Sequence, residues 1–441
     1  MTKKQHSPNF LFYTFLLILV WAPLPLGSNL PWAYMFLCML IFALSALWCG
    51  FYLFNKTTVT VAFKKAITVI FLLYFAQGFV AWQLFYQQTI DLHASLIELL
   101  LGISYSLLFC LSLLLINSQQ RIKITLYVLV ASGLFQAMLG SLMVLTGVEY
   151  LLITAKEHYL GNATGTFVNR NHLAGYLVMC LSLGIGLMIA GLKPGTGNLK
   201  EITRRVFEAL LSSKIILRLS LVIMVAGLVM THSRMGNSAF FISMGVIGTL
   251  AVILKGKSIG STVLLLTSLV LIDIAVVGTF FGIENVIDRL EKTSQKSETR
   301  DEVNLYSIKL VEDNVLTGTG TGTFYSAFPE VRKKDIGFMF YDHAHNDYVE
   351  FLTERGIIGI APLLLAVIIT FLVALKALYK RRNPLMRGCA FGCLMSMLAM
   401  AIHATVDFNL QIPANAATFM VVLAMGWIGG HHKGRRGKVR S

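Results

Sequence analysis

The amino-acid sequence predicts an all-α integral membrane protein with about twelve transmembrane helices and one large outer loop subdomain between spans nine and ten. Two compositional observations predict this class. Of the 441 residues, 56% are hydrophobic and only 13% are charged, whereas soluble domains carry about 25% charged residues. The apolar residues also gather in runs of the length that a bilayer requires, about 20 residues. These features exclude a soluble enzyme and a disordered chain.

The predicted spans follow one another along nearly the whole chain. Lys3 and Lys4 precede the first apolar run, as in a signal peptide, but no small-residue cleavage site follows it. We therefore interpret this run as the first span. The twelve predicted spans are 10–27, 31–53, 66–86, 96–116, 124–147, 172–192, 214–231, 236–254, 262–283, 356–378, 387–405 and 412–430.

The distribution of positive charge predicts that both termini lie in the cytoplasm. With the N-terminus inside, 25 of the 37 lysines and arginines fall in inner segments, and only Glu201 and Glu208 oppose them there. The net charge of +15 then reflects topology, and nucleic acid is not an expected partner. The basic tail, 431–441, is expected to contact anionic membrane lipids.

The spans divide the chain into three parts. Residues 1–283 carry spans one to nine, and 356–441 carry spans ten to twelve with the basic tail. Between them, 284–355 forms the loop subdomain that contains the candidate catalytic motif. A helix is expected in this loop because apolar residues recur three and four apart, at Val303, Tyr306 and Leu310.

Two features of the sequence resemble ligand sites that we reject. The glycine-rich turn 318–322 is followed by Thr323 and Phe324, so it lacks the lysine of a phosphate-binding loop. His343 and His345 would point the same way on an extended strand, but they offer no specific metal-ligand set. All six cysteines fall inside predicted spans, where we expect buried, apolar thiols and no disulfides. No metal and no cofactor is predicted.

A few arginines remain on the outer side, where they are not needed for topology. Arg234 lies in a tight turn, 231–236, at the hydrocarbon boundary, where a charge is costly unless it has a task or a partner. Arg170 and Arg355 lie beside membrane ends, and Arg300 opens the predicted loop helix. Guanidinium groups suit phosphate oxygens. The alternative for each arginine is local pairing with a loop carboxylate.

Histidines gather on the same side as these arginines. His232 neighbours Arg234, and His343 and His345 end the large loop. A histidine can accept a proton from a hydroxyl group near neutral pH. The outer face therefore combines candidate bases with candidate phosphate ligands.

One histidine belongs to a longer pattern. His345 and Asn346 are followed by nine residues and then by Gly356-Ile-Ile-Gly359. This spacing matches the signature His-(Asn/Ser/Gln)-x9-Gly-x-x-Gly of bacterial O-antigen ligases. The chain resembles the superfamily of O-antigen ligases and polymerases over roughly residues 160–410. Further similar segments, in the same order as in the family, are 165–175, 233–236 and 314–324.

The resemblance implies a metal-independent glycosyltransferase of the bacterial inner membrane whose active site faces the periplasm. Its donor would be a glycan linked to undecaprenyl pyrophosphate. By motif, His345 would be the general base, Arg234 would bind pyrophosphate and Arg300 would assist. Charge and position add Arg170 to the pyrophosphate ligands.

Secondary roles are expected for the neighbours of these residues. Asn346 and Asp347 are candidates for orienting the base, and His343 and His232 for contacting pyrophosphate or the acceptor. His343 is also a second candidate base. Gly356 and Gly359 are expected to be close-packing positions.

Several functions remain open within and beyond this superfamily. A ligase would transfer the glycan to a hydroxyl of lipid A–core. A polymerase of O-antigen or exopolysaccharide would join lipid-linked repeat units. Less favoured alternatives are a protein O-oligosaccharyltransferase and a transporter, which usually shows two corresponding halves with broken helices.

Overall fold

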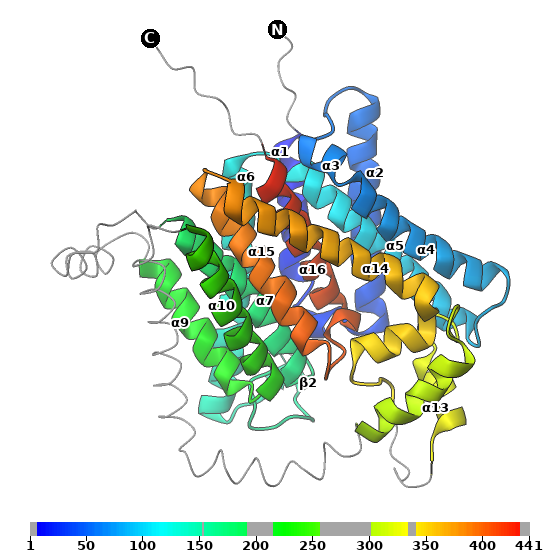
Figure 1. Ribbon diagram of the computed structural model, residues 1–441. Helices are drawn as coiled ribbons and strands as arrows, with labels where there is room; N and C mark the ends of the chain where they lie inside the picture. The colour runs from blue at the N-terminus through cyan, green and yellow to red at the C-terminus, as the bar shows by residue number, and fades with distance from the viewer. Residues whose placement is uncertain (1–6, 152–153, 192–214, 256–300, 334–340, 433–441) are drawn as a thin grey trace, which may run out of the picture.

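The computed structural model describes residues 7–151, 154–191, 215–255, 301–333 and 341–432 (Figure 1). Within these ranges the chain is helical apart from a two-stranded hairpin and the connections. Nine of the described helices are long and apolar enough to cross a membrane. They are α2 (Pro31–Leu53), α4 (Ile67–Phe85), α5 (Leu92–Leu115), α6 (Gln119–Thr146), α7 (Arg170–Ala190), α10 (Arg234–Lys255), α14 (Asp347–Lys380), α15 (Pro384–His403) and α16 (Pro413–His431).

The remaining described elements are shorter. Two apolar helices fall below spanning length, and a further helix covers 301–313. The labelled short elements are α1 (Asn9–Trp21), η1 (Leu26–Ser28), α3 (Val61–Lys65), β1 (Tyr150–Leu151), β2 (Thr154–Ala155), α9 (Ile215–Met230), α13 (Phe324–Val331) and η3 (Asn409–Gln411).

These helices confirm an all-helical, multi-pass membrane protein. Eleven of the twelve predicted spans coincide with described helices, and the ninth, 262–283, lies outside the described residues. The count of twelve and the inward orientation of both termini stay predictions. The first span was predicted too long: α1 ends at Trp21 because Pro23 and Pro25 follow, and proline cannot continue a helix.

The centre of the bundle is α7, which is buried almost throughout its length and packs against α6, α9 and α15 (Figure 1). Glycines bring α7 and α15 into backbone contact. A Cβ atom on Gly186 would lie 2.2 Å from the carbonyl oxygen of Gly388, and one on Gly388 would lie 2.1 Å from that of Gly186. Small residues allow such close approach between membrane helices. These contacts fix the C-terminal half of α7 against α15.

The cysteines mostly follow the prediction. All six are free thiols on helices, and five of them are buried. Cys49 is the exception: it is exposed on α2. This position was predicted to be buried, but the helix turns it to the outside of the bundle.

The two ends of the bundle differ in chemistry. One end carries α3 and the turn between α14 and α15, where Arg381 donates to the backbone carbonyl of His432. The other end carries α13 and the segment 341–346 (Figure 1). The predicted loop helix is confirmed: it covers 301–313, with Val303, Tyr306 and Leu310 buried. The candidate site lies at this second end.

The tenth predicted span is longer than expected. The boundary between the outer loop and this span was placed at 355/356, but α14 already begins at Asp347. Asn346 starts it by accepting the backbone N–H groups of Tyr348 and Val349 at 3.1 and 3.2 Å, which is a strong N-cap. The helix kinks at Gly356. Residues 347–355, which the sequence assigned to the loop, are therefore helical and lead directly into the membrane helix.

Candidate active site

Asp407, in the connection between α15 and α16, brings two histidines together. Its Oδ1 lies 3.8 Å from Nδ1 of His345 and 3.6 Å from Nε2 of His172. Both distances suit ion pairs and are longer than hydrogen bonds. Burial alone would raise the pKa of Asp407, but His172 and His345 beside it hold that pKa well below its usual range. The side chain therefore remains a carboxylate next to both rings.

Phe408 supplies an apolar platform for the same histidines. The ring of His343 stacks on it with centroids 4.0 Å apart, while His345 and His172 meet it edge-on at 4.9 and 4.7 Å. His343 and His345 therefore point to one place, although the segment between them is not a strand. Ala344 is buried, and His345 has a positive φ of 51°. The two rings converge because the chain turns.

His343 and His345 differ in their charged partners. Nδ1 of His343 donates a hydrogen bond to Oε1 of Glu350 at 2.7 Å. Burial disfavours its protonated form, but the carboxylate of Glu350 outweighs that cost and raises the pKa of His343 to about 9. At neutral pH His343 is thus a cation. A protonated imidazole cannot accept a proton, so this environment disfavours His343 as a base.

The first turn of α14 ties the histidine segment to the chain after α15. The other carboxylate oxygen of Glu350 accepts the backbone N–H of Ala344 at 2.8 Å. Asp347 donates its backbone N–H to the carbonyl of Ala404 at 2.9 Å, and its Oδ2 accepts the N–H of Leu410 at 3.1 Å. Asn346 and Asp347 thus contact backbone groups, which keeps His345 opposite Asp407.

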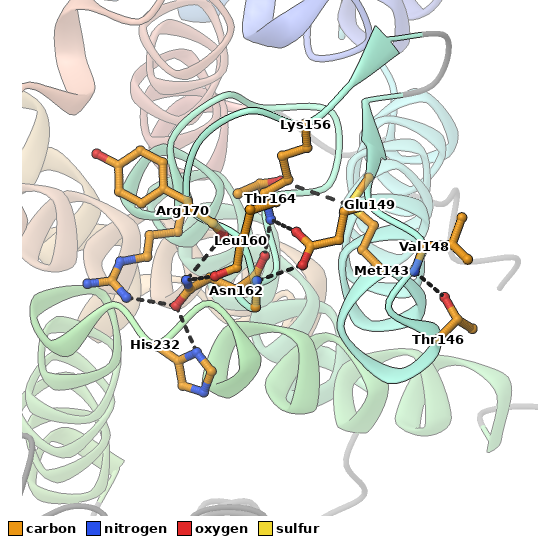
Figure 2. Close-up of polar contacts among 12 residues, drawn as sticks. Met143, Thr146, Val148, Glu149, Lys156, Leu160, Asn162, Thr164, Arg170 and His232 are labelled. Atoms are coloured by element: carbon orange, nitrogen blue, oxygen red, sulfur yellow. Dashed lines mark hydrogen bonds and ion pairs between the residues drawn. The ribbon is translucent and has the colours of Figure 1, made fainter.

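A second polar cluster surrounds Asn162, in the segment before α7. Figure 2 shows the side chains of Arg170 and His232 directed at its amide oxygen. Nη1 of Arg170 donates to Oδ1 of Asn162 at 2.7 Å, and Nδ1 of His232 lies 2.9 Å from the same oxygen. Arg234, exposed at the first position of α10, follows His232 by two residues. The cations therefore lie at the N-terminal ends of α7 and α10, where helix dipoles also favour anions.

The first turn of α7 connects the two clusters. It carries Arg170, which faces Asn162, and His172, which faces Asp407. One buried helix thus places a cation and a carboxylate-linked histidine two residues apart. A phosphate group and a nearby hydroxyl group are the chemical partners that suit such a pair of sites.

Glycines dock the large loop onto the kink of α14. Gly356, with φ of +55°, and Gly318, with φ of +69°, lie in backbone contact across the two segments: an added Cβ on either would come within 2.3 Å of the opposite chain. The N–H groups of Ile357 and Ile358 donate to carbonyls of the loop at 2.9 and 3.2 Å. Gly359 packs against the ring of Phe79. Both motif glycines are therefore at close-packing positions.

Arg355 stands apart from both clusters. Arg355 is buried, and its Nη2 lies 3.3 Å from Oε2 of Glu98, so the alternative of local pairing applies to it. The pair borders a cavity of about 120 Å³ lined mainly by apolar side chains. Arg300 lies outside the described residues. In the part of the chain that the structure describes, no group of three or more histidine, cysteine, aspartate or glutamate side chains is arranged to hold a metal ion.

Several site residues were missed by the sequence reasoning, among them His172, Asp407, Glu350 and Asn162. Asp407 and Glu350 belong to no recognised local motif, and Asn162 was noticed only as part of a glycosylation-like triplet. A signal was present for Asp407, because a carboxylate at the outer end of an apolar span is costly unless it is paired. Nothing in the sequence linked it to a histidine 62 positions earlier.

Comparison with models of protein families identifies a match. The sequence model of the family described as O-antigen ligase matches residues 219–364. This stretch contains Arg234, the large loop, both loop histidines and the two motif glycines, whereas Arg170, His172 and Asp407 lie outside it. Among curated proteins no match was found.

Proposed function

We propose that this chain, which belongs to the O-antigen ligase family through residues 219–364, transfers a glycan from undecaprenyl pyrophosphate to a hydroxyl group of lipid A–core. Members of the family are enzymes that transfer lipid-linked glycans. The proposal further sets the reaction at the periplasmic face of the bacterial inner membrane. The excess of basic residues in the segments assigned to the cytoplasm supports this orientation.

His345 is the proposed general base. The acceptor oxygen attacks the anomeric carbon, its proton passes to His345, and the bond from that carbon to the pyrophosphate oxygen breaks. Asp407 faces Nδ1 of His345 at 3.8 Å, which leaves Nε2 to meet the acceptor. The carboxylate stabilises the imidazolium as it forms in the transition state.

The leaving pyrophosphate is the proposed ligand of the cationic cluster. Charge develops on its oxygens as the glycosidic bond breaks, and fixed cations stabilise that charge. Arg234 and Arg170 are the proposed phosphate ligands, with His232 beside them and Arg300 assisting from outside the described residues. No metal is required in this scheme, because the guanidinium groups supply the positive charge.

One observation carries the proposal most directly. The first turn of α7 bears both Arg170, in the cationic cluster, and His172, against the carboxylate that faces His345. Both clusters therefore include a residue of the same helical turn, and we place the pyrophosphate at the first cluster and the anomeric carbon near the second. This arrangement suits group transfer between two bound molecules.

Deletion of the gene in its native host tests the proposal. Lipopolysaccharide is separated on a gel, and undecaprenyl-linked glycans are extracted in parallel. A ligase predicts loss of every O-antigen band from lipid A–core, with polymer accumulating on undecaprenyl pyrophosphate. If the deletion strain instead makes lipopolysaccharide with a single repeat unit, the protein is a polymerase and not a ligase. An unchanged profile of both fractions would contradict the proposal.

A further inference from the structure

We infer that Asn162 is a positioning residue that locks Arg170 and His232 together as one phosphate-binding unit. The inference rests on the proposed function and deepens it, because it names how two side chains from distant parts of the chain are held for the donor. Asn162 precedes Arg170 by eight residues and His232 by seventy. It links the start of α7 to the turn between α9 and α10 (Figure 2).

The hydrogen bonds of the Asn162 amide define its orientation. Its Nδ2 donates to the backbone carbonyls of Tyr159 and Leu160 at 3.1 and 2.9 Å. Oδ1 therefore faces the other way, toward Arg170 and His232, at 2.7 and 2.9 Å. An amide oxygen only accepts hydrogen bonds, so Nδ1 of His232 carries the proton in this contact. One oxygen thus orients a guanidinium group and selects the ring nitrogen of a histidine.

The backbone around Asn162 is held equally firmly. Nζ of Lys156 donates to the carbonyl of Asn162 at 2.7 Å and pairs with Glu149 at 2.5 Å. Glu149 also accepts the N–H of Gly161 at 2.6 Å. The side chain of Lys156 is 1% exposed, so this ion pair is shielded from solvent. The loop therefore presents the Asn162 amide from a rigid base.

A second link joins this base to the membrane helices. The N–H of Ala163 donates to the carbonyl of Met230, the last residue of α9, at 2.8 Å. The turn that carries His232 and Arg234 begins directly after Met230. Asn162 is therefore fixed relative to both cation-bearing segments. An uncharged side chain can therefore strengthen an anion site. By holding the long side chain of Arg170 in place before the anion binds, Asn162 lowers the entropy cost of binding.

The inference predicts weaker donor binding when the amide is removed. Asn162→Ala is expected to raise the inhibition constant of undecaprenyl pyrophosphate, used as the probe, and the donor KM about tenfold. A change of that size corresponds to the loss of one hydrogen bond to a charged group. The turnover number is expected to fall as well, because the cations that Asn162 positions stabilise the charge that develops on the leaving pyrophosphate.

Asn162→Asp changes the charge at this position while keeping an acceptor oxygen for both partners. The aspartate loses the Nδ2 donor to the carbonyls of Tyr159 and Leu160, and its charge offsets that of Arg170 and repels pyrophosphate. We expect its inhibition constant to rise at least as much as that of Asn162→Ala, and a melting curve checks that the variant is folded. Asn29→Ala, at an exposed asparagine between α1 and α2, is the matched control. It is expected to behave as wild type.

The outcomes distinguish this inference from the proposed function. The protein is assayed at full length in lipid nanodiscs, with Arg170→Ala and Arg234→Ala included. If both arginine variants bind undecaprenyl pyrophosphate as tightly as wild type, the proposed pyrophosphate site is wrong. If they bind weakly while folded Asn162→Ala and Asn162→Asp keep the wild-type inhibition constant, only the positioning role of Asn162 is wrong.

Discussion

Replacing Asp407 by asparagine removes the charge that faces the proposed base while keeping the shape of the side chain. The asparagine oxygen can still accept the N–H of Phe408, which Asp407 accepts at 2.8 Å. What is lost is the attraction between the carboxylate and the imidazolium that forms on His345 in the transition state. His345 and Asp407 are 3.8 Å apart at their nearest charged atoms.

That distance sets the scale of the effect. At an effective dielectric constant of about 20, two unit charges 3.8 Å apart attract by about 4 kcal/mol. This energy corresponds to a limit of about 10³-fold in rate. His172 shares the same carboxylate oxygen and weakens the loss, so we expect the turnover number to fall between about 30-fold and 10³-fold.

The assay uses purified protein in nanodiscs with a lipid-pyrophosphate-linked glycan and a lipid A–core acceptor, and the transferred glycan is quantified. Asp313→Asn is the control, because Asp313 is exposed at the end of the helix over 301–313. The donor KM is expected to change little. A folded Asp407→Asn protein that retains at least about a third of the wild-type turnover would refute the coupling of Asp407 to the base.

The other predictions concern the neighbouring histidine and the docked loop. His343→Gln is expected to retain turnover within about tenfold, because His343 is a cation at neutral pH and does not accept the proton. Since the folded pKa of His343 is raised to about 9, its pairing with Glu350 stabilises the fold fully below about pH 6.5 and loses that effect as pH rises through about 9. The melting temperature of Glu350→Gln should therefore approach that of wild type above pH 9, and a gap that is constant with pH would argue against the pairing. Gly318→Ala is expected to lower the free energy of unfolding by at least about 1 kcal/mol more than Gly147→Ala does. Both glycines have φ of +69°, but only a Cβ on Gly318 would meet opposing backbone. Equal melting temperatures of the two variants would contradict that contact.

The pattern of apolar residues along the sequence was sufficient to predict where the membrane helices lie. A span depends on the length of one apolar run, so eleven of the predicted spans coincide with described helices. The boundaries failed where short-range chemistry intervened: Pro23 ends α1 early, and the Asn346 cap starts α14 before the membrane. The loop helix was predictable because Val303 and Tyr306 mark one face within a single turn.

The candidate site was only partly predictable, for a physical reason. Arg234 and His345 carry local sequence patterns, and both could be named before the fold was known. Asp407 and Asn162 act through contacts that folding creates between distant segments. Glu350 and His343 are close in sequence, but only the turn that buries both makes the histidine a cation. The choice between the two histidines therefore needed the environment of each ring.

The most direct test of the account compares His345→Ala with His343→Ala in the nanodisc transfer assay. Glycan transferred from undecaprenyl pyrophosphate to lipid A–core is measured for both folded proteins at neutral pH. The account predicts that His345→Ala loses essentially all transfer and that His343→Ala retains measurable turnover. An active His345→Ala protein beside an inactive His343→Ala protein would show that His343 is the base and would contradict the central claim.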